Sequence, residues 1–150
     1  MRLRFDEQGR RAAAAFTSVD DAPDAVTRNL VVAGTMGLPA LTVPEDQGGM
    51  GANLLEFASY QQLLAGGDGS TALVLAMHHM LIGGEAEGGL WPPDQWGELC
   101  RGVVNEGGLV NSAATEPGAG TPSAGGLPAT VARREADSDP ASPLQAWLLT

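Results

Sequence analysis

The chain has 150 residues, of which 43% are hydrophobic and 17% are charged, and its formal net charge at pH 7 is −10. A chain of this length can bury one modest hydrophobic core. All eight of its basic residues other than histidine are arginines. So large an acidic excess leaves no basic surface for a phosphate backbone, which excludes nucleic acid as the expected partner.

The single cysteine rules out a disulfide within the chain. No apolar run is long enough to cross a bilayer, so we expect no membrane span. Met1 to Arg4 is basic, but acidic and small residues follow it instead of an apolar segment. We therefore expect no secretory signal and a cytoplasmic location.

Three helices are predicted in the first 65 residues. Residues 10–16 are rich in alanine, and the acidic stretch 20–24 marks the start of a helix that runs to about Gly37. A third helix is predicted from Asn53 to Ala65. Its apolar pattern places one group of residues on the core face, namely Leu54, Phe57, Ala58, Leu64 and Ala65, and leaves Glu56, Tyr60 and Gln62 elsewhere.

Two more helices follow. Residues 71–82 are apolar nearly all round, with Ser70 as the predicted N-cap. We expect this helix to be buried on most sides, like the central helix of a bundle, with one face toward the β domain. The glycine pairs at 83–84 and 88–89 interrupt the chain. Pro92-Pro93-Asp94 then opens a helix with apolar side chains at i, i+3, i+4, i+7 and i+8, namely Trp96, Leu99, Cys100, Val103 and Val104.

After Gly107 the pattern changes from helix to strand. Short apolar runs at 109–114, 129–134 and 144–149 are separated by stretches rich in Gly, Pro and Ser. We predict an α+β chain with two domains. Residues 1–107 form a mainly α-helical bundle, and residues 108–150 form the start of a β domain that is incomplete.

The segment from Asn111 to Thr121 is the strongest candidate for a ligand site. Small residues after the apolar run let a planar ligand approach the backbone, and Thr115 offers a hydroxyl group. Pro117 fixes a turn, while Gly118 and Gly120 permit positive φ, so backbone amides can converge on an anion. This chemistry suits a ring with polar edges that carries a phosphate tail.

The same segment resembles the signature of the acyl-CoA dehydrogenase family, in which an apolar run leads into Thr-Glu-Pro-x-x-Gly-Ser-Asp. Thr121 keeps the hydroxyl that the family usually takes from Ser, and Pro122 replaces the usual Asp. The resemblance implies FAD as cofactor, with the flavin ring held by Ser112, Ala113, Ala114 and Thr115. It also implies that Thr121 contacts the FAD pyrophosphate or the acyl-CoA substrate.

A second stretch, residues 37–51, resembles the family's Gly-Leu-x-x-Leu-x-Val-Pro-Glu-x-x-Gly-Gly-x-Gly link between two helices, with Gln47 where an aromatic residue is common. Together the two stretches imply the amino-terminal part of an FAD-dependent flavoprotein that introduces an α,β double bond into an acyl-CoA thioester in fatty acid metabolism. Full-length members of the family are more than twice as long, and their catalytic base lies beyond the equivalent of Thr150. We therefore expect no catalytic residue within this chain, no activity of the fragment alone, and a homo-oligomer when the protein is full length.

Two other interpretations stay open at this point. One is a flavin-dependent monooxygenase of the same fold, and the other is a non-catalytic fragment. His78 and His79 bear on the first, because they lie in the most hydrophobic helix and at least one must find a partner or face a cavity. Either both are hydrogen-bonded core residues, or one of them, with His78 as the candidate, lines the flavin pocket. Their directions on a helix differ by about 100°, which argues against a shared metal ion. Cys100 is most simply a small core residue.

Overall fold

The computed structural model describes residues 4–18, 22–112, 125, 131–134 and 147–149. The chain divides into two compact units, Met1–Asn111 and Ser112–Thr150. The first unit is helical, and its helices are α1 (Asp6–Ala15), α2 (Ala25–Thr35), η1 (Leu38–Thr42), η2 (Glu45–Gln47), α3 (Leu54–Ala65), α4 (Gly69–Gly88) and α5 (Pro93–Glu106). The helical amino-terminal part predicted from the sequence is confirmed.

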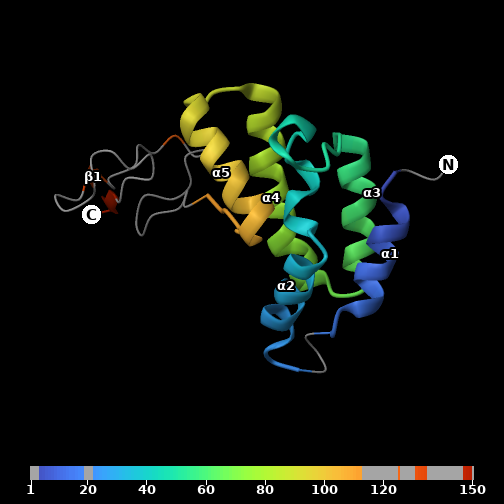
Figure 1. The fold of residues 1–150 in the computed structure, drawn as a ribbon. Coiled ribbons are helices and arrows are strands. Elements are labelled where there is room, and N and C mark those ends of the chain that lie inside the picture. Colours follow the sequence, from blue (N-terminus) through green and yellow to red (C-terminus); the bar gives the residue numbers. More distant parts are fainter. Residues whose placement is uncertain (1–3, 19–21, 113–124, 126–130, 135–146, 150) are drawn as a thin grey trace. The chain divides into compact units, whose positions relative to one another are not determined.

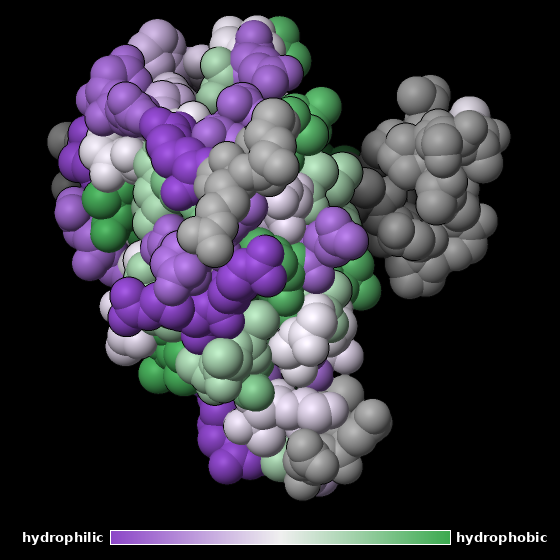
Figure 2. Space-filling view, turned by 90° about the vertical axis from the view of Figure 1, so that its right-hand side faces the viewer, coloured by the Kyte–Doolittle hydropathy of each residue, from purple (hydrophilic) through white to green (hydrophobic). Residues whose placement is uncertain are grey.

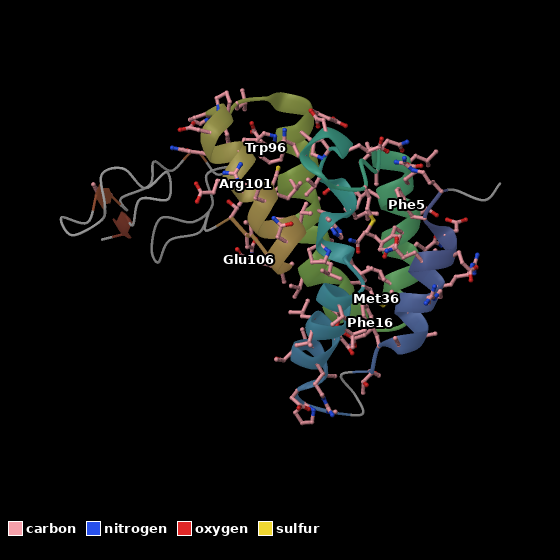
Figure 3. The ribbon with its side chains drawn as sticks, in the orientation of Figure 1. Phe5, Phe16, Met36, Trp96, Arg101 and Glu106 are labelled. Carbon is pink, nitrogen blue, oxygen red and sulfur yellow. The ribbon has the colours of Figure 1, made fainter. Side chains whose placement is uncertain are left out.

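The helices of this unit pack as a bundle around α4. Helix α1 packs against α3, α3 packs against α4, and the short helix η1 contacts α2, α4 and α5 (Figure 1). A first core cluster joins α1, α2, η1, α3 and α4, and it includes Ala12, Phe16, Leu38, Leu41, Tyr60, Leu64 and Leu75. A second joins η1, α4 and α5 through Val43, Ile82, Cys100 and Val103. Figure 3 labels Phe16, which belongs to the first cluster, Met36, which packs against it, and Trp96 of α5, which packs against the second.

The starts of α3 and α4 follow from their capping residues. The Asn53 side chain accepts a hydrogen bond from the Glu56 amide, and the Glu56 carboxylate accepts one from the Asn53 amide, which together form a capping box. Helix α4 is capped by Asp68, whose carboxylate accepts from the Thr71 amide over 2.7 Å. The predicted N-cap at Ser70 is therefore wrong, because Asp68 supplies the acceptor that the first turn needs and Ser70 already lies inside the helix.

The prediction that Gly83 and Gly84 interrupt the chain is also wrong. Helix α4 continues through them to Gly88 and ends where Gly89 adopts a left-handed conformation with φ of 58°. A glycine inside a helix costs only about 1 kcal/mol relative to alanine. On one side of the pair, Ile82 packs in the second core cluster, and on the other side the Glu85 carboxylate accepts a hydrogen bond from the Trp91 amide.

The face of α3 that meets the core differs from the predicted one. Leu54 is 72% exposed, whereas Tyr60 is buried in the first core cluster. The sequence pattern left Tyr60 off that face, but its ring supplies apolar area, and its Oη has no hydrogen-bond partner among the described residues. Burial raises the pKa of this hydroxyl. The position of α1, which packs against α3, decides which face is covered.

The glycine-rich link at residues 37–51 is held by close backbone contacts. A Cβ at Gly49 would lie 2.2 Å from the carbonyl oxygen of Val43, so no larger residue fits. The Arg4 side chain contacts the second half of the link. Its guanidinium forms an ion pair with Glu45 over 2.7 Å and donates hydrogen bonds to the carbonyl oxygens of Met50 and Gly51. Figure 2 shows the face of the helical unit that carries α1 and α3, where hydrophilic residues are interspersed with smaller hydrophobic groups.

The second unit contains two described strands, β1 (Ala132–Arg134) and β2 (Trp147–Leu149), which pair antiparallel with Arg133 opposite Leu148. Residues 109–112 form no strand, so that part of the predicted strand at 109–114 is wrong. A strand requires a hydrogen-bonded partner, and no described strand pairs with these residues. Two three-residue strands do not test the predicted β domain, which stays a prediction. The helices that the structure describes include none that is both long and apolar enough to cross a membrane.

Candidate functional site

Most of the predicted flavin-binding residues lie outside the part of the chain that the structure describes. Ala113, Ala114, Thr115 and Thr121 belong to this group, and Ser112 is described and exposed. The structure does describe residues 107–112, which lead into the segment. Their surroundings are therefore where a candidate site can be built.

A hollow of about 330 Å³ lies in the helical unit beside this lead-in. It is lined by Leu73, Val74 and Met77 of α4 and by Leu109, Val110 and Asn111. Five of these six side chains are apolar, and Asn111 adds one polar amide. Such a lining can take the face of a flat ring or a stretch of hydrocarbon chain, because apolar side chains offer dispersion contacts and bind water poorly.

The hollow is part of a longer apolar face of α4. Leu73 is 64% exposed and Met80 is 59% exposed, and Val74 and Met77 lie between them at 38% each. Within the helical unit, α2, α3 and η1 cover only the other face of α4. The prediction that this helix is buried on most sides, with one face toward the β domain, stays a prediction. An exposed apolar face of this size on one helix marks an interaction surface.

His78 is buried on the covered side of α4, only 1% exposed, and both of its ring nitrogens are hydrogen bonded. Nε2 lies 2.9 Å from the carbonyl oxygen of Pro39, and Nδ1 lies 3.1 Å from the backbone nitrogen of Val110. A carbonyl can only accept and an amide N–H can only donate. His78 is therefore neutral, with its proton on Nε2.

His79 has the same arrangement with different partners. Nε2 lies 3.0 Å from the carbonyl oxygen of Leu38, and Nδ1 lies 3.0 Å from Nε2 of Gln61. Its ring also meets Phe57 edge to face. The two histidines thus donate to the carbonyl groups of adjacent residues at the start of η1.

Burial lowers the pKa of both histidines. It brings the pKa of His79 to about 4, opposed by the bond to Leu38 and assisted by the neighbouring His78. For His78, burial again dominates and the bond to Pro39 opposes it. Both rings are therefore neutral at pH 7, as their hydrogen bonds require, and the hydrogen-bonded core interpretation fits the described geometry of both.

A larger hollow of about 520 Å³ lies between the glycine-rich link, the start of α3 and the second half of α4. Leu54, Phe57 and Met80 form its apolar wall, and Glu45 and Glu87 stand on its rim. His79 contributes to the lining, with both ring nitrogens already engaged. No group of three His, Cys, Asp or Glu side chains that could hold a metal ion occurs among the described residues.

Cys100 lies in the second core cluster and is fully buried, which confirms its interpretation as a core residue. Burial raises the pKa of its thiol, and the nearby Asp46 acts in the same direction. A thiol in this state is a poor nucleophile.

The comparisons with known proteins bear on this geometry directly. The N-terminal domain family of acyl-CoA dehydrogenases matches residues 6–87, which is more than half of the chain. The chain belongs to the acyl-CoA dehydrogenase family. It is also 36% identical, over 127 residues, to YdbM of Bacillus subtilis (strain 168), whose name gives it as a candidate acyl-CoA dehydrogenase.

The match to YdbM covers 85% of this chain and 29% of that protein, so the chain spans less than a third of the relative's length. At most 23 residues of the chain lie outside the match. The matched stretch therefore includes both motifs that carried the resemblance, at residues 37–51 and 111–121. The matched helical domain contains α4 with its histidine pair and its exposed apolar face.

Sequence reasoning missed the partners of the histidines. Gln61 lies in the middle of α3, and Val110 lies in a run that was predicted to be a strand. Neither has a neighbour in sequence that signals a bond to a histidine. Only the packing of α3 and of residues 107–111 against α4 brings them together.

Proposed function

We propose that this chain is the amino-terminal part of an FAD-dependent acyl-CoA dehydrogenase that removes hydrogen from the α and β carbons of an acyl-CoA thioester to give an enoyl-CoA. Membership of the family supports the proposal, as does the Asn111 to Thr121 segment. The structural observation that gives the proposal most support is the apolar hollow between α4 and residues 109–111, which lead into that segment. We propose that the full-length protein is cytoplasmic and a homo-oligomer.

The described residues fit the ring end of FAD. Leu73, Val74 and Met77 offer an apolar wall to a flat ring, and Asn111 offers an amide at its edge. When bound, FAD supplies the two-electron acceptor for the hydride that leaves the β carbon. The α4 side chains would exclude water from the reacting carbons, while Thr115 would hold a polar edge of the ring and Thr121 would hold the pyrophosphate or the acyl-CoA.

The hydrogen bonding of the histidines favours a dehydrogenase over a monooxygenase of the same fold. A histidine that serves the flavin needs a ring nitrogen free to exchange a proton with the site. The four ring nitrogens of His78 and His79 are occupied by Pro39, Val110, Leu38 and Gln61. This supports their role as structural residues.

The proposal is tested with Thr115→Val in the full-length flavoprotein. The replacement has a similar volume and no hydroxyl, and a buried polar group that loses its hydrogen bond costs about 1 to 3 kcal/mol. We expect flavin affinity to fall by roughly tenfold or more, together with the rate at which acyl-CoA reduces the flavin under anaerobic conditions.

Two variants serve as controls. Thr27→Val makes the same chemical change at an exposed position of α2, and Cys100→Ala removes a core thiol. Both should leave flavin affinity and reduction rate near those of the parent. If Thr115→Val leaves both quantities unchanged, the flavin does not lie on this segment. If acyl-CoA fails to bleach the flavin in the parent protein, the proposed reaction is wrong.

A further inference from the structure

Residues 107–111 connect the last helix of the helical unit to the segment that carries the flavin motif. Gly107 and Gly108 turn the chain after α5 through bonds from their amides to the carbonyl oxygens of Val103 and Gly102. The side chain of Val110 packs against the second core cluster. Its amide donates to Nδ1 of His78, which ties the segment to α4 across 32 positions of the sequence.

His78 thereby joins three elements at one point. It stands on α4, donates from Nε2 to Pro39 in η1, and accepts at Nδ1 from Val110. Each of its two partners is a backbone group, so both bonds fix the course of the chain and neither depends on the rotamer of a second side chain. The bond to Val110 is available only in the tautomer that the bond to Pro39 selects.

The residue that His78 holds is adjacent to the first residue of the proposed flavin segment. Val110 precedes Asn111, and Asn111 lines the apolar hollow together with Val110 and Met77. A displacement at Val110 therefore changes the wall of the hollow and the position of Asn111 beside it. Positioning errors of about 1 Å are sufficient to lower the rate of an enzyme substantially.

We propose that His78 is a positioning residue: through its bond to the Val110 amide, it fixes residues 109–111, which line the hollow and lead into the proposed flavin segment. The inference rests on the proposed function for its consequence at the flavin, whereas the bond itself is independent of it. His79 serves as the internal comparison, because it makes matching bonds to Leu38 and Gln61 and none to residues 107–111.

Two substitutions separate the two bonds of His78. In His78→Asn the side-chain oxygen is as many bonds from Cα as Nδ1, so it can accept from Val110, while the donor to Pro39 is lost. In His78→Gln the side-chain nitrogen is as many bonds from Cα as Nε2, so it can donate to Pro39, while the acceptor for Val110 is lost. Both variants are neutral and polar.

The measurement is hydrogen exchange of the Val110 amide in the chain of residues 1–150. We expect His78→Gln to speed this exchange by about tenfold or more, because the loss of a hydrogen bond to a buried group changes the local opening equilibrium by about that factor. We expect His78→Asn, which keeps the acceptor, to stay within about threefold of the parent. The buried amides of Leu75 and Val103 report the integrity of the fold. Equal protection of Val110 in parent and His78→Gln overturns the proposal.

A second measurement needs no substitution and decides the case if a variant fails to fold. In the parent, ¹⁵N shifts of the imidazole should show the Nε2–H tautomer, and a coupling through the hydrogen bond should connect the Val110 nitrogen to Nδ1. Finding the Nδ1–H tautomer overturns the proposal.

The consequence for the flavin is measured in the full-length flavoprotein. His78→Gln should shift the visible absorption of the bound flavin and lower the affinity of the protein for FAD. His78→Asn should leave both the absorption and the affinity close to those of the parent. An unchanged flavin in His78→Gln, despite faster Val110 exchange, overturns the role at the site. If the parent protein binds no FAD, the proposed function fails while the result at Val110 stands.

Discussion

At the scale of single residues, the histidine pair shows how burial and hydrogen bonding act together. Each ring gives its proton to a carbonyl of η1 and accepts from a donor on another segment, Val110 or Gln61. Protonation would add a second N–H opposite an existing donor. Two effects therefore favour the neutral form of each ring: burial disfavours the charged form, and the partner at Nδ1 is a donor that a protonated nitrogen could not accept from.

This pair predicts a pH dependence of stability. The pKa of His79 is about 4 in the folded chain and about 6.5 when unfolded. Between these values the unfolded chain binds the extra proton, so stability is complete above about pH 6.5, falls as pH decreases toward 4, and levels off below that. The loss from His79 is on the order of 3 kcal/mol.

Urea unfolding between pH 7 and pH 4 measures the effect. His79→Gln removes the titrating ring and keeps a donor for Leu38, so the fall in unfolding free energy should be smaller in this variant. An equal fall in parent and variant would contradict the assignment to His79.

A second residue-scale prediction concerns two glycines with opposite environments. A Cβ at Gly49 would lie 2.2 Å from the Val43 oxygen and 2.3 Å from its Cβ, whereas a Cβ at Gly84 would meet nothing within 4 Å. Gly49→Ala should destabilise the chain by about 2 to 4 kcal/mol. Gly84→Ala, inside α4, should stabilise it by about 0.5 to 1 kcal/mol because alanine loses less backbone entropy.

Thermal or urea unfolding of the two alanine variants checks both signs. A stable Gly49→Ala would show that the link at residues 37–51 can move away from Val43. A destabilised Gly84→Ala would show that the middle of α4 is more constrained than its open surroundings indicate.

At the scale of elements, α4 organises the helical unit. Its covered face carries Leu75, Ile82 and both histidines, and its other face carries the exposed side chains Leu73, Val74, Met77 and Met80. The N-cap of the helix, Asp68, is itself buried, and its carboxylate accepts a hydrogen bond from the Thr71 amide. Position and length of this helix decide which residues reach η1 and which reach the hollow.

The capping of α4 gives an element-scale prediction. Asp68→Ala should lower the unfolding free energy by about 0.5 to 2 kcal/mol, because the first turn loses its side-chain acceptor. Ser70→Ala lies two positions away inside the helix and is exposed. It should change stability little, since alanine is the better helix former there.

Denaturant unfolding of both variants distinguishes the two candidate caps. A larger loss in Ser70→Ala than in Asp68→Ala would restore the N-cap at Ser70 and move the start of α4.

At the scale of the whole molecule, the proposed function makes this chain one part of a larger site. It spans 29% of the length of YdbM, and the apolar face of α4 has no cover within the helical unit. The described residues offer one wall for a ring and one amide at its edge. A cofactor with a long pyrophosphate tail needs further contacts to bind tightly.

We therefore predict that residues 1–150 alone bind FAD weakly, with a dissociation constant at least about 100-fold above that of the full-length flavoprotein. Fluorescence titration of FAD with each protein measures the ratio. Stoichiometric FAD that copurifies with residues 1–150 would show that this chain holds the cofactor by itself.

The sequence by itself determined the family, the helical character of the first hundred residues and the α5 face from Trp96 to Val104, because each depends on local spacing or on a contiguous motif. The tertiary structure decided what depends on neighbours distant in sequence. It chose Asp68 over Ser70 as the cap, buried Tyr60 while exposing Leu54, and continued α4 through two glycines. It also paired His78 with Val110. Such choices follow from which surfaces meet when helices pack, and a linear pattern carries no record of that.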